Sequence, residues 1–434
     1  GIGKGKKSPL GPQVFTLPGK VYAIYYPKAA ETGELNLSSH PGPFTRRWYN
    51  PRTGEYEGKA DQVQGGGWIQ VGKAPGDADQ DWAAVLRGVA KSSKADATAS
   101  PGVNHSSIVF PGKSWETRSA RELGLDEAKL DKLAEELGSR GCVIKDGYVV
   151  KTWGSQTQVG DWFSSAKPVL STLLMFAIRE GKVKSPDQPI ADFGWPLKPK
   201  DQGMTFRHLA SMTSGYARPE KPGEAWSYND FAIQLYQQTL FDRVYKDDPA
   251  RVANDPSRFG AIGLEDGLVF RKKNRRISAS VRDFARIAWF WLNQGNWDGK
   301  QILPREMFVQ NQKPQVPSGL PLTKPAETED YLKIGSYGGG SDHFSKCGPG
   351  IYGFNWWFNG KVRDQENRLT WPDAPEELFM SVGARGNCAA MLPSQHAILV
   401  AADANWGALD GGKPQSRMSR ILKLFAEAVS PGQP

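Results

Sequence analysis

A serine and a lysine that could act together, Ser164 and Lys167, stand three positions apart at the start of an apolar run that ends at Gly181. The apolar residues of this run recur at helical spacing, which predicts a buried helix with polar residues at its mouth. A serine hydroxyl is a weak nucleophile until a base takes its proton, and a lysine one helical turn away lies on the same face. A lysine that is desolvated or crowded by cations can act as that base. Such a pair also occurs by chance at solvated helix starts, so it needs support from the rest of the chain.

Length and charge limit the classes of protein to consider. The chain has 434 residues, which favours two or three domains and allows a sizeable core. Its 55 lysines and arginines exceed its 46 aspartates and glutamates, for a formal charge of +9. This excess is too modest over such a length to indicate an acidic partner. No apolar run approaches the roughly 18 residues needed to cross a bilayer, so we expect no membrane span.

One dense basic cluster, Arg271 to Arg276, stands out from this even distribution. It is interpreted either as a solvated loop or as a site for an anionic polysaccharide or another polyanion. No recognisable nucleic-acid-binding fold accompanies the cluster, so nucleic acid is not expected as a partner.

Cysteine usage says little about the compartment. Cys142, Cys347 and Cys388 lie far apart, and neither they nor the five scattered histidines have the spacing of a zinc site. We therefore expect no metal ion.

No signal peptide is visible at Gly1, but a mature chain would have lost one, so a periplasmic or secreted location is the expectation. The sequence does not indicate an oligomeric state.

Composition divides the chain into a flexible lead (1–13), a small β-sandwich module (14–90), a linker (91–109) and a larger domain (110–434). The module contains short alternating segments between turn residues, which is typical of a sandwich. These segments are Val21 to Tyr26, Phe44 to Tyr49, Trp68 to Val71 and Trp82 to Leu86.

The larger domain has strand-like segments at both ends and a helical region between them. Residues 142–151 predict two strands around an Asp-Gly turn, while 387–392 and 397–402 predict two more near the C-terminus. We expect one antiparallel sheet assembled from distant parts of the chain and covered by helices, an α/β (α+β) architecture.

From about Phe110 onward, the chain resembles the serine β-lactamase-like superfamily. The similarity is to its class C branch, with penicillin-binding-protein-like esterases and 6-aminohexanoate-dimer-hydrolase-like enzymes. It spans some 320 residues in the family's order, which is far more specific than any single motif. The matching segments are Ser164-Ser-Ala-Lys167, His208 to Gly215, Pro222 to Asp230, Asp283 to Arg286 with Asn293 to Gly299, and Tyr352 to Trp357.

This resemblance implies roles for a second element, Tyr228-Asn229-Asp230. A phenol near an ammonium can exist partly as phenolate and relay protons, which makes Tyr228 a candidate catalytic residue beside Ser164 and Lys167. Asp230 stands where the family usually has asparagine, and its carboxylate would favour the protonated lysine. Alternatively, Asn229 takes the place of that amide.

The family's third motif is placed at Ser381-Val382-Gly383. A glycine there lets substrate approach the strand, and the backbone amides of Ser164 and Ala384 are the predicted oxyanion hole. Ordinary strand packing is the alternative for this segment. Ser381 supplies no charge for a substrate carboxylate. Arg385 and Trp226 are the candidates for contacting substrate.

The expected activity is therefore carboxylic-ester hydrolysis through an acyl-enzyme on Ser164, with no metal or organic cofactor. The alternatives are a D-amino-acid peptidase, amidase or β-lactamase on the same site, and a catalytically silent carbohydrate-binding or scaffold protein. Residues Arg47 to Gly54, followed by Asp81-Trp82, resemble the small collagen-binding-type β domain often appended to glycoside hydrolases. That resemblance suggests an ester on a small molecule or on an acylated polysaccharide.

Overall fold

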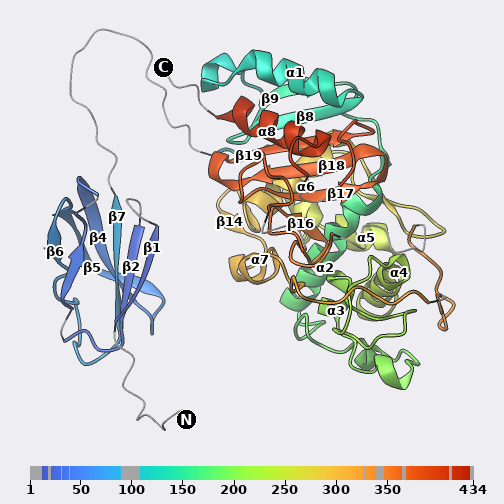
Figure 1. Ribbon diagram of the computed structural model, residues 1–434, viewed down its shortest axis with the longest axis horizontal. Helices are drawn as coiled ribbons and strands as arrows, with labels where there is room; N and C mark the ends of the chain where they lie inside the picture. The colour runs from blue at the N-terminus through green and yellow to red at the C-terminus, as the bar shows by residue number, and fades with distance from the viewer. Residues whose placement is uncertain are drawn as a thin grey trace. The chain divides into compact units, whose positions relative to one another are not determined.

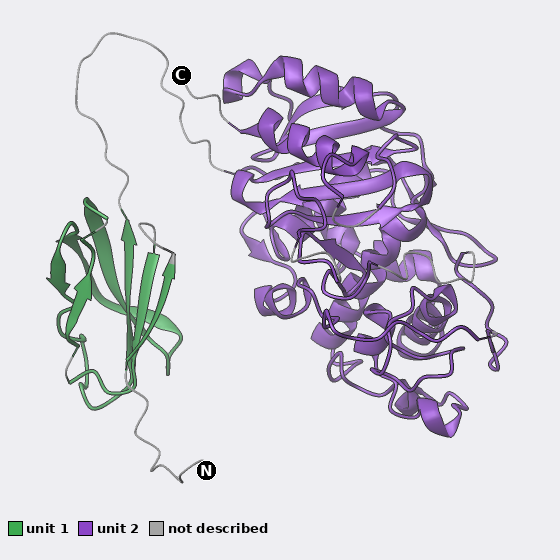
Figure 2. Cartoon of the chain, viewed as in Figure 1, with its two compact units in different colours: residues 1–101 green, residues 102–434 purple. Residues whose placement is uncertain are grey.

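Two units make up the chain, residues 1–101 and 102–434 (Figure 2). The computed structural model describes residues 12–17, 21–30, 32–38, 40–88, 108–326, 328–338, 347–363, 368–409 and 413–430. Most of the predicted lead (1–13) and linker (91–109) lies outside these ranges.

The first unit is a small β domain. Its described strands form one sheet in the order β1-β2-β7-β4-β5 and a second sheet that pairs β3 with β6. Every second residue of β2 is buried, because alternate side chains of a strand point to one face. Trp48, Trp82 and Leu86 from neighbouring strands complete that core. The strands are β1 (Gln13–Leu17), β2 (Val21–Tyr26), β3 (Glu34–Asn36), β4 (Pro43–Asn50), β5 (Glu55–Gln64), β6 (Trp68–Gln70) and β7 (Trp82–Gly88).

The second unit is built on an antiparallel sheet in the order β15-β16-β17-β18-β19-β8-β9. β8 pairs with β19, from Lys145 opposite Ala397 to Arg140 opposite Ala402. Segments from both ends of the unit thus meet in the middle of the sheet, and the predicted fold class is confirmed. The strands are β8 (Arg140–Lys145), β9 (Tyr148–Trp153), β15 (Tyr352–Gly353), β16 (Trp356–Phe358), β17 (Phe379–Gly383), β18 (Asn387–Leu392) and β19 (Ala397–Ala402).

The turn between β8 and β9 shows why the sequence folds into a hairpin here. Asp146 and Gly147 both have positive φ angles, 53° and 90°. A tight hairpin with this geometry favours Asp-Gly, because glycine carries no Cβ and aspartate tolerates the left-handed region.

Helices cover the sheet. α6 packs against β8, β18 and β19, while α1 packs against β9 and α8; Figure 1 shows α1 and α8 on the viewer's side of the sheet and α6 behind it. The helices are α1 (Glu127–Leu137), α2 (Lys167–Arg179), α3 (Phe206–Ala210), α4 (Asp230–Gln238), α5 (Pro249–Asn254), α6 (Val281–Leu292), α7 (Arg305–Asn311) and α8 (Arg417–Val429). None of the helices in the described part of the chain has the length and apolar character that a membrane crossing requires.

Shorter strands form two further sheets. β10 (Gly160–Asp161), β12 (Ile277–Ala279) and β11 (Val269–Phe270) form a small antiparallel sheet beside the turn that precedes α2, and β13 (Asn296–Trp297) pairs with β14 (Lys300–Gln301). β10 leads directly into the turn that carries Ser164.

Candidate active site

A 3-10 turn, Phe163–Ala166, presents Ser164 just before α2 begins at Lys167. Ser164 is half-buried, whereas Lys167 is 0% exposed. The lysine Nζ lies 3.1 Å from the serine Oγ. Trp162 stacks on Phe284 of α6, with ring centroids 3.8 Å apart, and this fixes the turn on the core. The pair predicted from spacing is therefore in hydrogen-bond contact at the edge of a buried region.

Tyr228 completes the contact. Lys167 Nζ donates a hydrogen bond to Tyr228 Oη at 3.0 Å. The phenol ring is held by aromatic neighbours, with Trp357 at 5.9 Å and Tyr352 at 6.0 Å between centroids. The structure thus brings together three side chains that lie up to 64 positions apart in the sequence. Residues of β15 and β16 pack against the Tyr228 ring and hold it in this position.

Asp230, not Asn229, faces the lysine. Its Oδ1 accepts from Lys167 Nζ at 2.8 Å, and the two side chains are 5% and 0% exposed. The Asn229 side chain instead caps α4, accepting from the backbone N–H groups of Phe231 and Ala232. The alternative that Asn229 replaces the family's amide is therefore wrong, because its side chain is used at the helix terminus.

Lys167 consequently has an acceptor for each of its three ammonium hydrogens: Ser164 Oγ, Tyr228 Oη and Asp230 Oδ1. Burial raises the pKa of Tyr228 above its ordinary value, and the negative charge of Asp230 raises it further, while a hydrogen bond with Ser164 lowers it. The resting arrangement is a buried ion pair with a neutral phenol beside it.

Tyr337 belongs to the site as well, and sequence reasoning missed it. Its ring centroid lies 5.2 Å from Lys167 Nζ, and its Oη donates to the carbonyl of Phe163 at 3.0 Å. Its backbone N–H donates to the carbonyl of Asp230. Tyr337 therefore ties the serine turn to the start of α4. No motif marked it, since its role depends on the folding of a loop between distant elements.

The third motif lies on β17, beside the serine turn. A Cβ added to Gly383 would stand 2.6 Å from the Trp162 carbonyl oxygen and 2.7 Å from the Ser165 nitrogen, so only glycine fits there. Ser381 is 0% exposed, and its Oγ lies 2.7 Å from Ser165 Oγ. This hydroxyl therefore ties the strand to the turn. Val382 is buried as well.

Ala384, the predicted second oxyanion donor, begins the exposed 3-10 turn Ala384–Gly386 directly after β17. The oxyanion role of its amide and that of Ser164 stay predictions. Arg385 is exposed and lines a pocket beside the same turn. For Trp226 the prediction of substrate contact was wrong. Its side chain is 0% exposed and packs 6.2 Å from the Tyr228 ring, so it supports the tyrosine from behind.

Within the described ranges, no group of three or more histidine, cysteine, aspartate or glutamate side chains could hold a metal ion.

The fold and this contact of serine, lysine and tyrosine are similar to those of β-lactamase-type serine hydrolases. Residues 129–255 match the sequence model of the family described as Beta-lactamase. A solved structure of a candidate beta-lactamase of Bacteroides dorei is similar in fold, with a TM-score of 0.50 at 18% identity, over 70% of this chain and 99% of that one.

Two further proteins are similar to this chain. A candidate 6-aminohexanoate-dimer hydrolase of Bacillus anthracis aligns with a TM-score of 0.47 at 15% identity, over 74% of this chain and 88% of that one. An uncharacterized protein of Alkalihalophilus pseudofirmus is 23% identical over 229 residues, which are 42% of this chain and 67% of that protein.

Proposed function

We propose that the second unit hydrolyses carboxylic esters through an acyl-enzyme on Ser164. The observation that carries this proposal is the contact of Lys167 Nζ with both Ser164 Oγ at 3.1 Å and Tyr228 Oη at 3.0 Å. A serine whose hydroxyl is half-exposed and touches a buried amine has the geometry of an activated nucleophile.

In the first step, Ser164 Oγ attacks the ester carbonyl carbon. The pair of Lys167 and Tyr228 acts in the form that has lost one proton, as amine with phenol or as ammonium with phenolate. The bond from Oγ to carbon forms while the serine proton passes to this pair. The bond from carbon to the alcohol oxygen then breaks, and the pair returns the proton to the departing alkoxide. The backbone amides of Ser164 and Ala384 are proposed to stabilise the tetrahedral oxyanion.

In the second step, water attacks the acyl carbon. The same pair takes the water proton and gives one back to Ser164 Oγ, so the acid is released and the enzyme is restored. Asp230 keeps the lysine in place throughout, since its Oδ1 lies 2.8 Å from Lys167 Nζ. The phenol contacts the same Nζ and is proposed to share each proton transfer with the amine.

Esters rank above β-lactams and peptides because of the third motif. Ser381 carries no charge, and its hydroxyl is engaged with Ser165 in the core. The first position of this motif therefore differs from that of penicillin-directed members of the resembled family, which commonly hold the substrate carboxylate with a cationic or hydrogen-bonding residue there. A D-amino-acid peptidase, amidase or β-lactamase remains the second candidate because the serine, lysine and tyrosine would serve it equally.

Rates on p-nitrophenyl acetate, nitrocefin and a D-Ala-D-Ala peptide would separate these activities. We expect the highest kcat/KM on the acetate ester. Dominant turnover of nitrocefin or of the peptide would overturn the ranking. Ser164→Ala is the matched control, and loss of ester turnover in this variant is expected if the activity belongs to this site.

We also propose that the natural ester is carried by an acylated polysaccharide encountered in the periplasm or outside the cell. The support is the resemblance of the first unit to modules of polysaccharide-degrading enzymes, together with Trp68, which is 65% exposed and could stack on a sugar ring. Retention of the whole protein on an immobilised acylated polysaccharide, compared with Trp68→Ala, tests this. Equal retention of both proteins would remove Trp68 from the proposal.

A further inference from the structure

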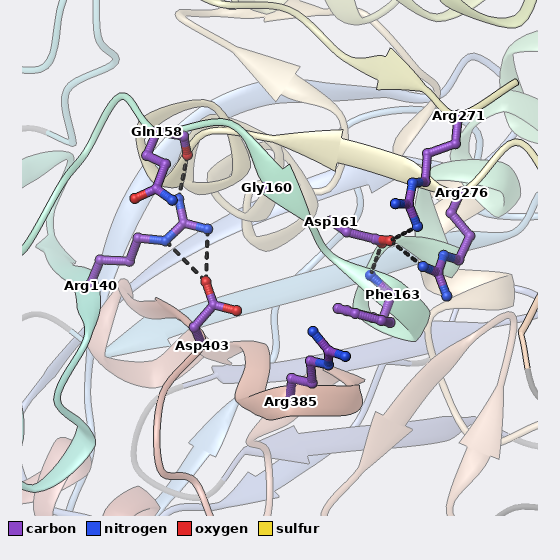
Figure 3. A pocket seen from close by; sticks show the side chains of 9 residues that line it. All are labelled: Arg140, Gln158, Gly160, Asp161, Phe163, Arg271, Arg276, Arg385 and Asp403. Atoms are coloured by element: carbon purple, nitrogen blue, oxygen red, sulfur yellow. Dashed lines mark hydrogen bonds and ion pairs between the residues drawn. The ribbon is translucent and has the colours of Figure 1, made fainter.

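A pocket of ≈ 420 Å³ lies beside the serine turn and is lined mainly by charged side chains (Figure 3). Four of the lining residues are arginines and two are aspartates, which leaves two positive charges in excess. These residues are Arg140, Asp161, Arg271, Arg276, Arg385 and Asp403. They come from β8, β10, the segment joining β11 to β12, the turn after β17 and the position directly after β19.

Both aspartates are already engaged. Asp403 accepts from Arg140 at 3.0 Å, and Asp161 pairs with Arg276 at 2.7 Å and with Arg271 at 3.2 Å. These pairs form two separate groups at opposite sides of the pocket in Figure 3.

Arg385 stands between the two groups and joins neither of them (Figure 3). Among the described residues its guanidinium has no ion pair and no hydrogen bond, and its Cζ lies 5.5 Å from the centroid of the Phe163 ring. Arg276 adds a buried Nε that has no hydrogen-bond partner in the described part of the chain. The pocket therefore contains guanidinium donors that the protein itself does not saturate.

The position of Phe163 links this pocket to the nucleophile. Phe163 precedes Ser164 and lies between Arg385 and Arg276, whose Cζ is 4.7 Å from the ring centroid. Its backbone N–H donates to Asp161 Oδ1 at 2.8 Å. Arg385 in turn follows Ala384, the proposed oxyanion donor. The pocket is therefore lined by the neighbour of Ser164 and by the neighbour of Ala384 in the chain.

We infer that this pocket binds a carboxylate carried by the substrate, so that the preferred substrates are anionic esters. The inference rests on the proposed ester hydrolysis and adds its substrate class. A planar guanidinium presents paired N–H groups that match the two oxygens of a carboxylate, and Arg385 has both its charge and its donors available. The excess positive charge also attracts anions from solution.

The structure argues against reading the basic cluster Arg271 to Arg276 as one strip for a long polyanion. Arg271 and Arg276 point to Asp161, whereas Arg275 pairs with Asp242 at 2.7 Å. The arginines of the cluster are thus divided between two carboxylates. A single carboxylate in a pocket suits this arrangement better than a line of phosphates or sulfates.

The test compares matched anionic and neutral esters on the whole protein. For a carboxylate on the acyl side, 4-nitrophenyl hemiadipate is compared with 4-nitrophenyl methyl adipate. For one on the alcohol side, 4-acetoxybenzoate is compared with its methyl ester. We expect kcat/KM to favour the anionic ester by about tenfold in one of these arms, because one charge-assisted contact is gained. About 0.5 M NaCl should bring the ratio toward one, since salt screens an exposed guanidinium.

Arg385→Gln should reduce this preference about tenfold, and Arg385→Lys should reduce it less, because the charge stays but the fork is lost. Arg121→Gln, which removes an exposed arginine that does not line the pocket, should keep the wild-type ratio. Equal kcat/KM for both esters in both arms, with hydrolysis still dependent on Ser164, would overturn the carboxylate pocket alone. No Ser164-dependent turnover of any of these esters would overturn the ester hydrolase as well.

Discussion

Two cations lie near the same serine turn, and their surroundings differ completely. Lys167 is 0% exposed and donates to three oxygen atoms, while Arg385 is exposed and its guanidinium has no polar partner among the described residues. The lysine network is closed, so it fixes the geometry of the serine and the phenol. The arginine is open, so it can receive a group from outside. Both side chains are cations, so charge alone does not distinguish them. The number of hydrogen-bond acceptors around each cation does: the ammonium of Lys167 has three and the guanidinium of Arg385 has none among the described residues.

The stability of the buried network around Lys167 depends on each of its hydrogen-bonding groups. Withdrawing a lysine and a carboxylate from water costs several kcal/mol per ion, and their attraction offsets this only when geometry and additional hydrogen bonds are good. The 2.8 Å contact between Lys167 and Asp230 and the two further acceptors meet that condition. Removing members of the closed network, or freeing further charge in the arginine pocket, tests this comparison.

The largest effect is expected for Lys167→Met. This change removes the amine from the serine and leaves the Asp230 carboxylate buried without its cation. We expect ester turnover to fall by at least about a thousandfold and the free energy of unfolding to fall by about 3–5 kcal/mol. Urea denaturation measures the second quantity. The double variant Lys167→Met with Asp230→Asn should regain part of the lost stability, and no recovery would mean that the ion pair is not the source of the loss.

Tyr228→Phe keeps the ring between its aromatic neighbours but removes the hydroxyl that Lys167 contacts. The expected loss in kcat is about 10²- to 10⁴-fold, in the range of a proton-transfer group, with little change in thermal stability. Steady-state kinetics on p-nitrophenyl acetate gives this value. A variant that keeps wild-type kcat would exclude the phenol from the chemistry.

Asp230→Asn tests how the carboxylate sets the pH dependence. The Asp230 charge is a cause, after burial, of the raised pKa of Tyr228. Removing the charge lowers that pKa toward its ordinary value, so the phenol gives up its proton more readily. The limb of the kcat/KM profile that depends on deprotonation of the Lys167 and Tyr228 pair should then move to lower pH. A shift to higher pH, or no shift, would contradict the proposed coupling.

The smallest effect is expected for Asp161→Asn in the arginine pocket. This change releases Arg271 and Arg276 from their carboxylate and leaves an oxygen that can still accept from the Phe163 N–H. We expect the preference for anionic over neutral esters to rise by about threefold, as one more positive charge becomes available. The ratio of the two kcat/KM values is the measurement, and a lower ratio would show that Asp161 holds the pocket in its binding form.

Several features of this comparison were visible in the sequence. Helical spacing placed Ser164 and Lys167 on one face, and the segment around Tyr228 was identified by its motif. The hairpin at Asp146-Gly147 followed from local turn chemistry, which depends only on neighbouring residues.

Other features depend on contacts between distant segments. The choice of Asp230 over Asn229 is made by the start of α4, which uses the asparagine as its cap. The inward orientation of Ser381 depends on Ser165, 216 positions away. Trp226 was misassigned because a tryptophan beside a catalytic candidate can as easily support it as face substrate. The arginine pocket could not be foreseen, since its residues come from five separate segments.

The most direct test of the account is covalent labelling of the intact protein with a fluorophosphonate, followed by mass spectrometry and peptide mapping. We predict one added group, located on Ser164 and absent in Ser164→Ala, with slower labelling in Tyr228→Phe. A folded wild-type protein that stays unlabelled, or that is labelled at another serine, would contradict the assignment of Ser164 as the nucleophile.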